Sequence, residues 1–218
     1  MGTDPAGFID LFDAGHWFDM QAYTTEDLGR AQAYAARAAA LAEQSGATDI
    51  GGYLAGLDMK ARLYRPDQSD IARVAQLELK TNQFNVTTRR YSEAQIRDFM
   101  ERNDAVVLAF RLADRFGDHG LTSTLVAFQE DDAMRIDSWL MSCRILSRSA
   151  EQFMLRRLID IAKGMGAIKL VGEYRATPKN DVVADLYPRM GFLVRANGLY
   201  ERPLGGGPED WVTYIAGV

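Results

Sequence analysis

Cysteine and histidine are scarce in this sequence. Its 218 residues contain one cysteine, Cys143, and two histidines, His16 and His119. A single cysteine cannot form a disulfide bond within the chain, and with the histidines far apart it makes no recognisable zinc-binding pattern. We therefore expect no metal in this chain and a reducing, cytoplasmic setting, in which Cys143 is the only thiol available for chemistry.

Long hydrophobic runs and an excess of basic residues are also missing. No apolar run approaches the roughly 20 residues that span a bilayer, and residues 1–17 lack the basic flank and apolar core of a secretion signal. The formal net charge of −5 creates no general attraction for nucleic acid or for an anionic membrane. We expect neither of them as a partner. The rest of the composition is that of an ordinary globular protein, so function has to be sought in local motifs.

The first quarter of the chain has a helical pattern. Residues 24–47 form an alanine-rich amphipathic run that begins at a candidate N-cap, Thr24 or Thr25, and stops at a Ser-Gly pair. Large apolar residues are few, so this helix needs another surface to dock on. We predict that residues 1–57 form a helical N-terminal extension and that residues 58–218 form the main domain.

From residue 58 onward, helical and strand-like patterns alternate. We predict strands over residues 59–65, 105–112, 121–129, 134–143, 168–174, 191–203 and 210–217, and helices over residues 68–82, 91–103, 149–166 and 180–190. Turns at 114–120, which include His119, and at 130–133 separate the three central strands. This order predicts an α/β fold with a mixed central sheet and helices on both faces. Parallel neighbours in such a sheet splay apart at their C-terminal ends, where a cofactor can enter and meet the next helix's N-terminus.

The order of elements resembles that of the GNAT acyltransferase superfamily. In that superfamily a Q/R-x-x-G-x-G/A loop after the fourth strand binds the pyrophosphate of coenzyme A through backbone N–H groups. The matching residues here are Arg144, Ser147, Arg148 and Ser149, which the resemblance makes cofactor-binding residues. Serine stands at both glycine positions, so a left-handed backbone there costs about 1 kcal/mol or more. The alternative is that Ser147 or Ser149 simply caps the following helix.

A second GNAT-like motif lies near the C-terminus. Residues 180–192 match N-x-x-x-x-x-x-Y-x-x-x-G-F, with Asn180, Tyr187, Gly191 and Phe192 at the defined positions. The resemblance places Asn180 in the cofactor site and makes Tyr187 the general acid for a departing thiolate. A phenol with a pKa of about 10 suits that step. The alternative is that Tyr187 is a packing aromatic at a helix end.

Further segments resemble a narrower group. Residues 75–99, 114–121, 137–146 and 172–180 are similar to the C-terminal region of FkbH-type proteins, above all in the string KTNQFN at residues 80–85. The resemblance implies transfer of a glyceryl group from 1,3-bisphosphoglycerate, through an enzyme thioester, to the phosphopantetheine of an acyl carrier protein for polyketide extender units. The D-x-D motif of those proteins' phosphatase domain is absent. The chain is therefore either a stand-alone relative or a C-terminal part whose partner is a separate haloacid-dehalogenase-like phosphatase domain.

The candidate site residues each have a second interpretation. Cys143, next to Arg144 and before a helix N-terminus, is the predicted thioester carrier, or else a buried core cysteine. His119 is the predicted base, or else a solvated turn residue. Asn82 and Gln83 are predicted to bind the glyceryl group, or else Asn82 or Asn85 caps the C-terminus of the preceding helix. Lys179 is predicted to meet phosphate, or else to be simply solvated.

Two other functions fit the same motifs. The first is an acyl-CoA-dependent GNAT N-acetyltransferase, with Tyr187 as the acid and the 144–149 loop on coenzyme A. The second is a non-catalytic module that docks the carrier protein. An acyl carrier protein is acidic, as is this chain, so docking needs a local basic patch. Candidates for the patch are Arg89, Arg90, Arg156, Arg157 and Lys163, whose alternative is ordinary helix surface.

Overall fold

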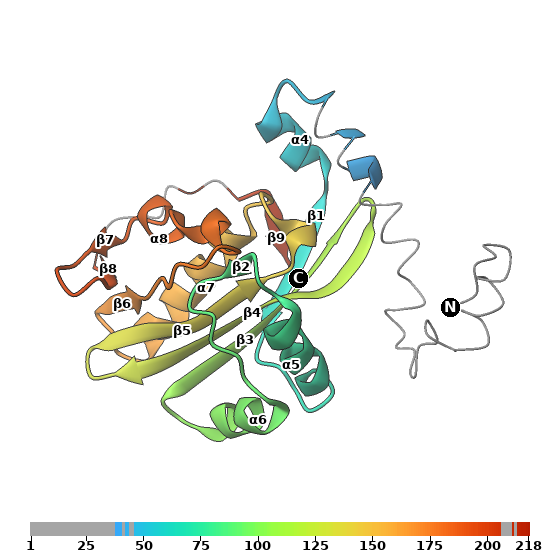
Figure 1. The fold of residues 1–218 in the computed structure, drawn as a ribbon. Helices are drawn as coiled ribbons and strands as arrows, with labels where there is room; N and C mark the ends of the chain where they lie inside the picture. Colours follow the sequence, from blue (N-terminus) through green and yellow to red (C-terminus); the bar gives the residue numbers. More distant parts are fainter. Residues whose placement is uncertain (1–37, 41, 44–45, 206–210, 212) are drawn as a thin grey trace, which may run out of the picture.

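The computed structural model describes residues 38–40, 42–43, 46–205, 211 and 213–218 (Figure 1). Most of the helix predicted over residues 24–47 lies outside the described residues, although residues 38–40 and 42–43 are helical. Helix α4 (Ile50–Gly56) follows and leads into the first strand. Its Tyr53 and Leu54 are buried in the main core, so α4 packs on the domain that it precedes.

A mixed sheet forms the centre of the domain. Its strands are β1 (Met59–Tyr64), β2 (Phe84–Asn85), β3 (Ala105–Asp114), β4 (Gly117–Glu130), β5 (Ala133–Met141), β6 (Lys169–Gly172), β7 (Leu193–Val194), β8 (Tyr200–Pro203) and β9 (Ile215–Gly217). They are ordered β7-β8-β6-β5-β4-β3-β1-β9, and β2 pairs with β5. The β5–β6 and β1–β9 pairs are parallel, and the other pairs are antiparallel. The predicted mixed α/β sheet is thereby confirmed.

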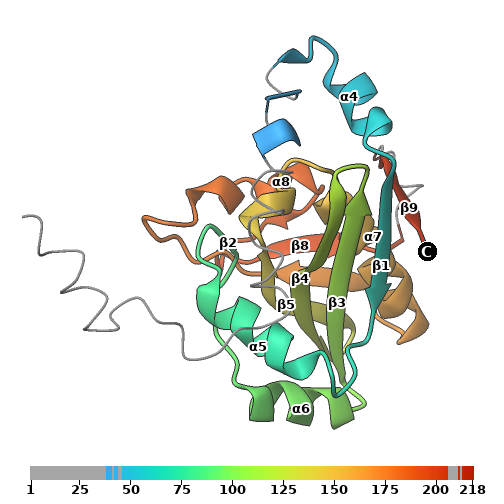
Figure 2. The ribbon, with the colours of Figure 1, turned by 90° about the vertical axis from the view of Figure 1, so that its right-hand side faces the viewer.

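Helices cover both faces of this sheet. They are α5 (Ile71–Lys80), α6 (Glu93–Glu101), α7 (Ala150–Gly164) and the short α8 (Leu186–Arg189). Figure 2 shows α5 and α6 on one side and α7 on the other. Each side has its own apolar core, one with Ile71 and Val74 of α5 and the other with Leu155 and Leu158 of α7. Each such side chain contributes about 1.5–3 kcal/mol on burial, so both layers hold the sheet.

Most predicted elements are confirmed, but several differ in extent. The helix predicted over residues 180–190 is a 3-10 turn, η3 (Asp181–Val183), followed by α8. Among the described residues of the strand predicted over 210–217, only Ile215–Gly217 forms a strand. The helix after Ser92 has the predicted capping box, in which Ser92 and Gln95 bond reciprocally. The strand predicted over residues 191–203 is instead a hairpin of β7 and β8, because Gly198 adopts a φ of 79° at the turn. The hairpin connection predicted at 114–120 is confirmed, but its turn is tighter: Asp114 pairs with Gly117, so only Arg115 and Phe116 form the turn, and His119 lies within β4.

The splay predicted between parallel strands is present, but another segment lies in it. Strands β5 and β6 pair only over Ala133–Ile136 and Lys169–Gly172. Beyond Ile136, β5 continues to Met141 and pairs there with β2 instead. The edge of β5 beyond its pairing with β6 is thus taken by the loop that connects α5 and α6.

Candidate functional site

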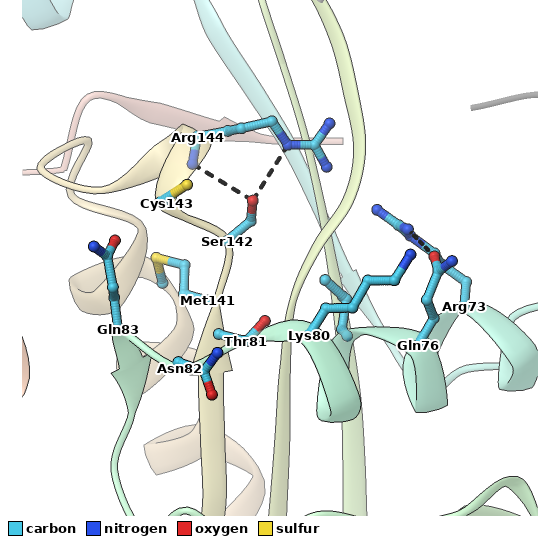
Figure 3. A pocket seen from close by; sticks show the side chains of 11 residues that line it. Arg73, Gln76, Lys80, Thr81, Asn82, Gln83, Met141, Ser142, Cys143 and Arg144 are labelled. Carbon is cyan, nitrogen blue, oxygen red and sulfur yellow. Dashed lines mark hydrogen bonds between the residues drawn. The ribbon is translucent and has the colours of Figure 1, made fainter. Parts of the chain in front are cut away.

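Cys143 lies on the surface at the end of β5. It opens the short 3-10 turn η2 (Cys143–Ile145), and its side chain is exposed. The alternative of a buried core cysteine is therefore wrong, because the strand ends at Met141 and the turn leaves the sheet. The residue lines a pocket of about 450 Å³ between this strand end and the last two turns of α5 (Figure 3). We call this space the Cys143 pocket; it is lined by Arg73, Gln76, Leu77, Lys80, Thr81, Asn82, Gln83, Met141, Ser142, Cys143 and Arg144.

Positive charge borders the Cys143 pocket. Three of its lining residues are the cations Arg73, Lys80 and Arg144. None of the lining residues is acidic. Arg144 donates from its backbone N–H and its Nε to Ser142 Oγ, at 3.4 and 3.2 Å. Figure 3 shows Cys143 and Gln83 at one end of the pocket and Lys80 and Arg73 toward the other. A concave space of this charge favours an anionic ligand such as a phosphate ester.

The structure brings Asn82 and Gln83 into the same pocket as Cys143. The C-terminus of α5 is capped by Arg90, which donates to the carbonyl oxygens of Glu78, Leu79 and Thr81, and by Asn85, whose Nδ2 donates to the Thr81 carbonyl oxygen at 3.5 Å. The capping alternative therefore holds for Asn85. Arg90 also donates to Asn82 Oδ1 at 2.6 Å, which fixes the orientation of that amide. Both Asn82 and Gln83 are exposed, so their amide groups are placed to bind hydroxyl or carbonyl groups of a ligand in the pocket.

His119 lies in a separate, nearly buried cluster. Its Nε2 is 2.9 Å from Asp114 Oδ2 and 3.3 Å from Arg148 Nη1, and its side chain is 11% exposed. Burial lowers the pKa of His119, and the Arg144 cation lowers it further, so the imidazole is neutral at pH 7. The solvated-turn interpretation is wrong. His119 does not line the Cys143 pocket, and its role as a base stays a prediction.

The 144–149 loop keeps the backbone shape of a glycine loop with serine side chains. Ser147 and Ser149 adopt φ angles of 62° and 61°, both left-handed. Ser149 precedes α7 without making a side-chain cap bond, so for this residue the capping alternative is wrong. Both serines line a second pocket of about 260 Å³, together with Phe84, Val182 and Arg189 among others. Arg148 instead turns inward and forms a salt bridge with the buried Asp114.

Ser149→Gly is expected to raise the free energy of unfolding by up to about 1 kcal/mol. A left-handed conformation costs a serine roughly 1–2 kcal/mol, which glycine avoids. The greater conformational freedom of glycine in the unfolded chain offsets part of this stabilisation. Thermal unfolding of the two proteins measures the difference. Ser149→Ala is the matched control, because alanine keeps the Cβ that causes the strain; an equal rise in that variant would contradict the explanation.

Asn180 is a structural centre in this fold. It is fully buried, and its Nδ2 donates to the carbonyl oxygens of Asn85 and Arg175 at 2.8 and 2.9 Å. Its Oδ1 accepts from the N–H and the hydroxyl of Thr177, at 2.7 and 2.9 Å. Oδ1 also accepts a longer bond from the Tyr174 hydroxyl, at 3.4 Å. These five bonds use the whole amide to join the loop after β6 to β2. Because its amide is used within the protein, Asn180 could serve a cofactor site only by positioning these loops.

Tyr187 and Lys179 lie away from the Cys143 pocket. Tyr187 is 1% exposed and stacks on Tyr200 with ring centroids 5.1 Å apart. Burial raises the pKa of its phenol, and among the described residues no group completes a hydrogen bond with its hydroxyl. Lys179 is exposed in the loop after β6. Neither residue lines the Cys143 pocket.

Two polar groups have partners that the sequence did not indicate: Arg89, named above only as a candidate for the basic patch, is half-buried, and Glu78 is fully buried. Arg89 bridges β5 and the end of β6: Nη1 donates to the Asp137 carbonyl at 3.0 Å, and Nη2 lies 2.8 Å from Glu173 Oε2. Glu78 of α5 is fully buried against the sheet, and burial raises its pKa to about 8. In the sequence Glu78 is adjacent to Leu77, a member of the apolar stripe of α5. A charged residue at such a position is the one sign of Glu78's burial that the sequence offers.

The described residues provide two further observations. Over residues 38–40, 42–43, 46–205, 211 and 213–218, no three His, Cys, Asp or Glu side chains gather as metal ligands do. In that same part of the chain, no helix has the length and apolar character needed to cross a bilayer.

Comparison with known proteins finds similar folds among solved structures. No protein-family model and no curated protein matches the sequence. The ribosomal-protein-S18-alanine N-acetyltransferase from Escherichia coli is similar in structure, with a TM-score of 0.50 and 14% identity over 70% of this chain and 99% of that one. A domain from Methanocaldococcus jannaschii has a TM-score of 0.51 and 14% identity, covering 67% of this chain and 99% of that one.

A third solved structure is a named GNAT domain. The GNAT domain of S. lividans PAT matches with a TM-score of 0.50 and 13% identity, covering 66% of this chain and 90% of that one. Identities this low carry information about the fold alone. The resemblance to the GNAT superfamily is thereby confirmed at the level of the fold: this chain has the mixed α/β architecture of GNAT acetyltransferase domains.

Proposed function

We propose that this chain transfers an acyl group through a thioester on Cys143. In the first step the Cys143 sulfur attacks the carbonyl carbon of an acyl phosphate. A C–S bond forms, the C–O bond to phosphate breaks, and inorganic phosphate leaves. In the second step the thiol of an acceptor attacks the thioester carbonyl, and the Cys143 thiolate departs. The donor is 1,3-bisphosphoglycerate, so the group that forms on Cys143 is 3-phosphoglyceryl. A separate haloacid-dehalogenase-like phosphatase domain would hydrolyse its 3-phosphate with water, releasing inorganic phosphate and leaving glyceryl. The acceptor is the phosphopantetheine of an acyl carrier protein.

A single observation carries this proposal: the one cysteine opens into a pocket that also contains Asn82, Gln83 and three cations. The amides match the hydroxyl groups of a glyceryl chain, and the cations match the phosphate that leaves. The KTNQFN string that resembles FkbH-type proteins supplies both amides. The sequence resemblance and the pocket geometry therefore support the same substrate class, both through Asn82 and Gln83.

Transfer to a carrier protein tests the proposed function. The chain is incubated with 1,3-bisphosphoglycerate and a phosphopantetheinylated carrier protein, with and without a haloacid-dehalogenase-like phosphatase domain, and the carrier is weighed by intact mass spectrometry. With the native chain we expect the carrier to gain one glyceryl group when the phosphatase domain is present and one 3-phosphoglyceryl group when it is absent. With Cys143→Ala we expect neither. Equal loading of the carrier by Cys143→Ala would rule the thioester out.

Loss of the pocket amides is expected to slow loading of the carrier about tenfold or more. Asn82→Ala and Gln83→Ala each remove hydrogen bonds that orient the acyl group relative to the sulfur, and small misplacements cost large factors in rate. Alkylation of Cys143 by iodoacetamide, which needs no orientation, should stay unchanged in both variants. Gln68→Ala is the matched control, because Gln68 is an exposed amide outside the pocket. An equal effect of all three variants would contradict a role in binding.

The fold itself favours a second candidate, a coenzyme A-dependent N-acetyltransferase. The left-handed backbone at Ser147 and Ser149 keeps the loop shape that presents N–H groups to an anion, and Tyr187 would be the acid. This candidate predicts that Cys143→Ala retains acetyl transfer from acetyl coenzyme A to an amine. A docking module predicts, in contrast, carrier binding without acylation of any thiol.

A further inference from the structure

The edge of β5 beyond Ile136 is the natural place for an extended ligand. Parallel strands β5 and β6 part there, and an unpaired strand edge offers N–H and C=O groups to any chain that contains amides. The pantetheine arm of coenzyme A or of a carrier protein is such a chain. Whether the arm can lie along this edge depends on whether the edge groups of β5 are available.

These groups are already bonded to the protein's own chain. Phe84 and Asn85 pair with Met141 and Leu140 as strand β2, and the Val86 N–H donates to the Trp139 carbonyl at 3.2 Å. At the next residue, Thr87 Oγ1 donates to the Asp137 carbonyl oxygen at 2.8 Å. The edge carbonyls of β5 from Asp137 to Met141 are therefore engaged by residues 84–87, which we call the inserted segment.

The opposite side of the inserted segment is bonded to the other wall of the gap. The Arg175 N–H donates to the Val86 carbonyl at 2.9 Å, and Asn180 Nδ2 donates to the Asn85 carbonyl at 2.8 Å. The segment thus bridges β5 and the loop after β6 like a strand within a sheet. An arm of pantetheine could enter only after these bonds had broken on both sides.

Side-chain packing also holds the inserted segment in place, in addition to its backbone hydrogen bonds. Phe84 is 1% exposed and Val86 and Thr87 are fully buried, and Phe84 meets Trp139 edge-to-face with ring centroids 5.9 Å apart. Arg89 then closes the segment with its bonds to Asp137 and Glu173. Displacing the segment would expose Phe84 and Val86, and each would cost about 1.5–3 kcal/mol.

Phe84 also stands between the two ends of the route that coenzyme A would need. The pocket with Ser147 and Ser149, where a pyrophosphate would meet the N-terminus of α7, is lined by Phe84. The Cys143 pocket is lined by the preceding residue, Gln83. An arm that ran inside the groove from the serine loop to the sulfur would meet the inserted segment, whose Phe84 lines the serine pocket.

The geometry points to a single route for the acceptor thiol. We infer that the inserted segment fills the groove between β5 and β6, so that a pantetheine thiol reaches the exposed Cys143 from the solvent side, through the Cys143 pocket beside Gln83, and not along the groove. The route rests on the proposed function, since it concerns the acceptor of that reaction. It also selects the acceptor: an arm presented by a carrier protein can enter the pocket end-on, whereas free coenzyme A finds no groove for its arm and no link to the serine loop.

Binding of desulfo-coenzyme A tests the filled groove. This analogue lacks the thiol, so it cannot form a disulfide with Cys143. We expect no saturable binding by calorimetry at concentrations up to about 1 mM and unchanged hydrogen exchange at the amides of Val86 and Arg175. Binding with a dissociation constant below about 100 μM, together with faster exchange at either amide, would overturn the inference.

Disulfide exchange with pantethine tests the route through the pocket. Cys143 attacks the pantethine disulfide, a mixed disulfide forms and one pantetheine thiol leaves. Gln83→Trp, which narrows the Cys143 pocket, is expected to slow this reaction about tenfold or more. Val182→Trp is the matched control, because Val182 is exposed and lines the serine pocket instead. Slowing by Val182→Trp and not by Gln83→Trp would place the arm in the groove and refute the inference.

These outcomes are separable from those of the proposed function. Neither measurement requires acylation, so the filled groove can be confirmed even if no glyceryl group is ever found on Cys143. Conversely, glyceryl transfer through Cys143 with tight binding of desulfo-coenzyme A would support the reaction and contradict the route.

Discussion

Asp114→Asn is expected to lower the free energy of unfolding by about 3 kcal/mol or more. Asp114 has no exposed side-chain surface, and Arg148, its partner in a salt bridge, is 10% exposed. The same carboxylate oxygen lies 2.9 Å from His119 Nε2. An asparagine keeps the bond from the Phe116 N–H to Oδ1 but leaves the buried guanidinium without a counter-charge. Chemical denaturation at pH 7 measures the loss.

A second substitution separates the cost of an unpaired charge from general damage. Arg148→Met in the Asp114→Asn background removes the uncompensated cation and keeps a long apolar side chain in its place. We expect the double variant to regain most of the lost stability, as buried ion pairs replaced on both sides usually do. Further destabilisation of the double variant would show that the pair is not the source of the effect.

Glu78→Gln is expected to stabilise the protein at alkaline pH by several kcal/mol. Burial raises the pKa of Glu78 to about 8, well above that of a glutamate in an unfolded chain. The folded state therefore holds the proton more tightly than the unfolded state does. Stability from this group is fully present below about pH 4 and is lost as the pH rises toward 8, on the order of 3–5 kcal/mol in all.

The amide introduced by Glu78→Gln removes this pH dependence. It is uncharged at every pH and can still accept the hydrogen bond that Thr124 Oγ1 donates at 3.3 Å. The free energy of unfolding, measured for both proteins from pH 5 to pH 9, should converge at the acid end and diverge at the alkaline end. Glu101→Gln, at an exposed position on α6, is the control and should follow the native curve. Parallel curves for native protein and Glu78→Gln would contradict the buried carboxyl as the cause.

The fold was predictable where its signals are local. The capping box at Ser92 and Gln95, the apolar stripe of α5 and the turn residues between β4 and β5 each act over a few residues. Their order was enough to predict the mixed sheet and the GNAT-like architecture. The left-handed strain at Ser147 and Ser149 also followed from the sequence, because glycine is the residue that such loops normally use.

The interior of the site was not predictable, because its partners are far apart in the chain. Strand β2 has two residues and pairs with a strand more than fifty positions later, so no periodicity announces it. The same holds for Asp114 and Arg148, 34 residues apart. A histidine between Asp118 and Gly120 has the pattern of a turn, and only the register of β3 against β4 moves it into a strand.

A trapped intermediate tests the central claim most directly. The native chain is mixed with 1,3-bisphosphoglycerate in the absence of any carrier protein, quenched in acid, digested and analysed by tandem mass spectrometry. The account predicts one 3-phosphoglyceryl group per chain, located on Cys143 and released by hydroxylamine, as thioesters are. Loading of the carrier without such an adduct, or an adduct on any other residue, would contradict it.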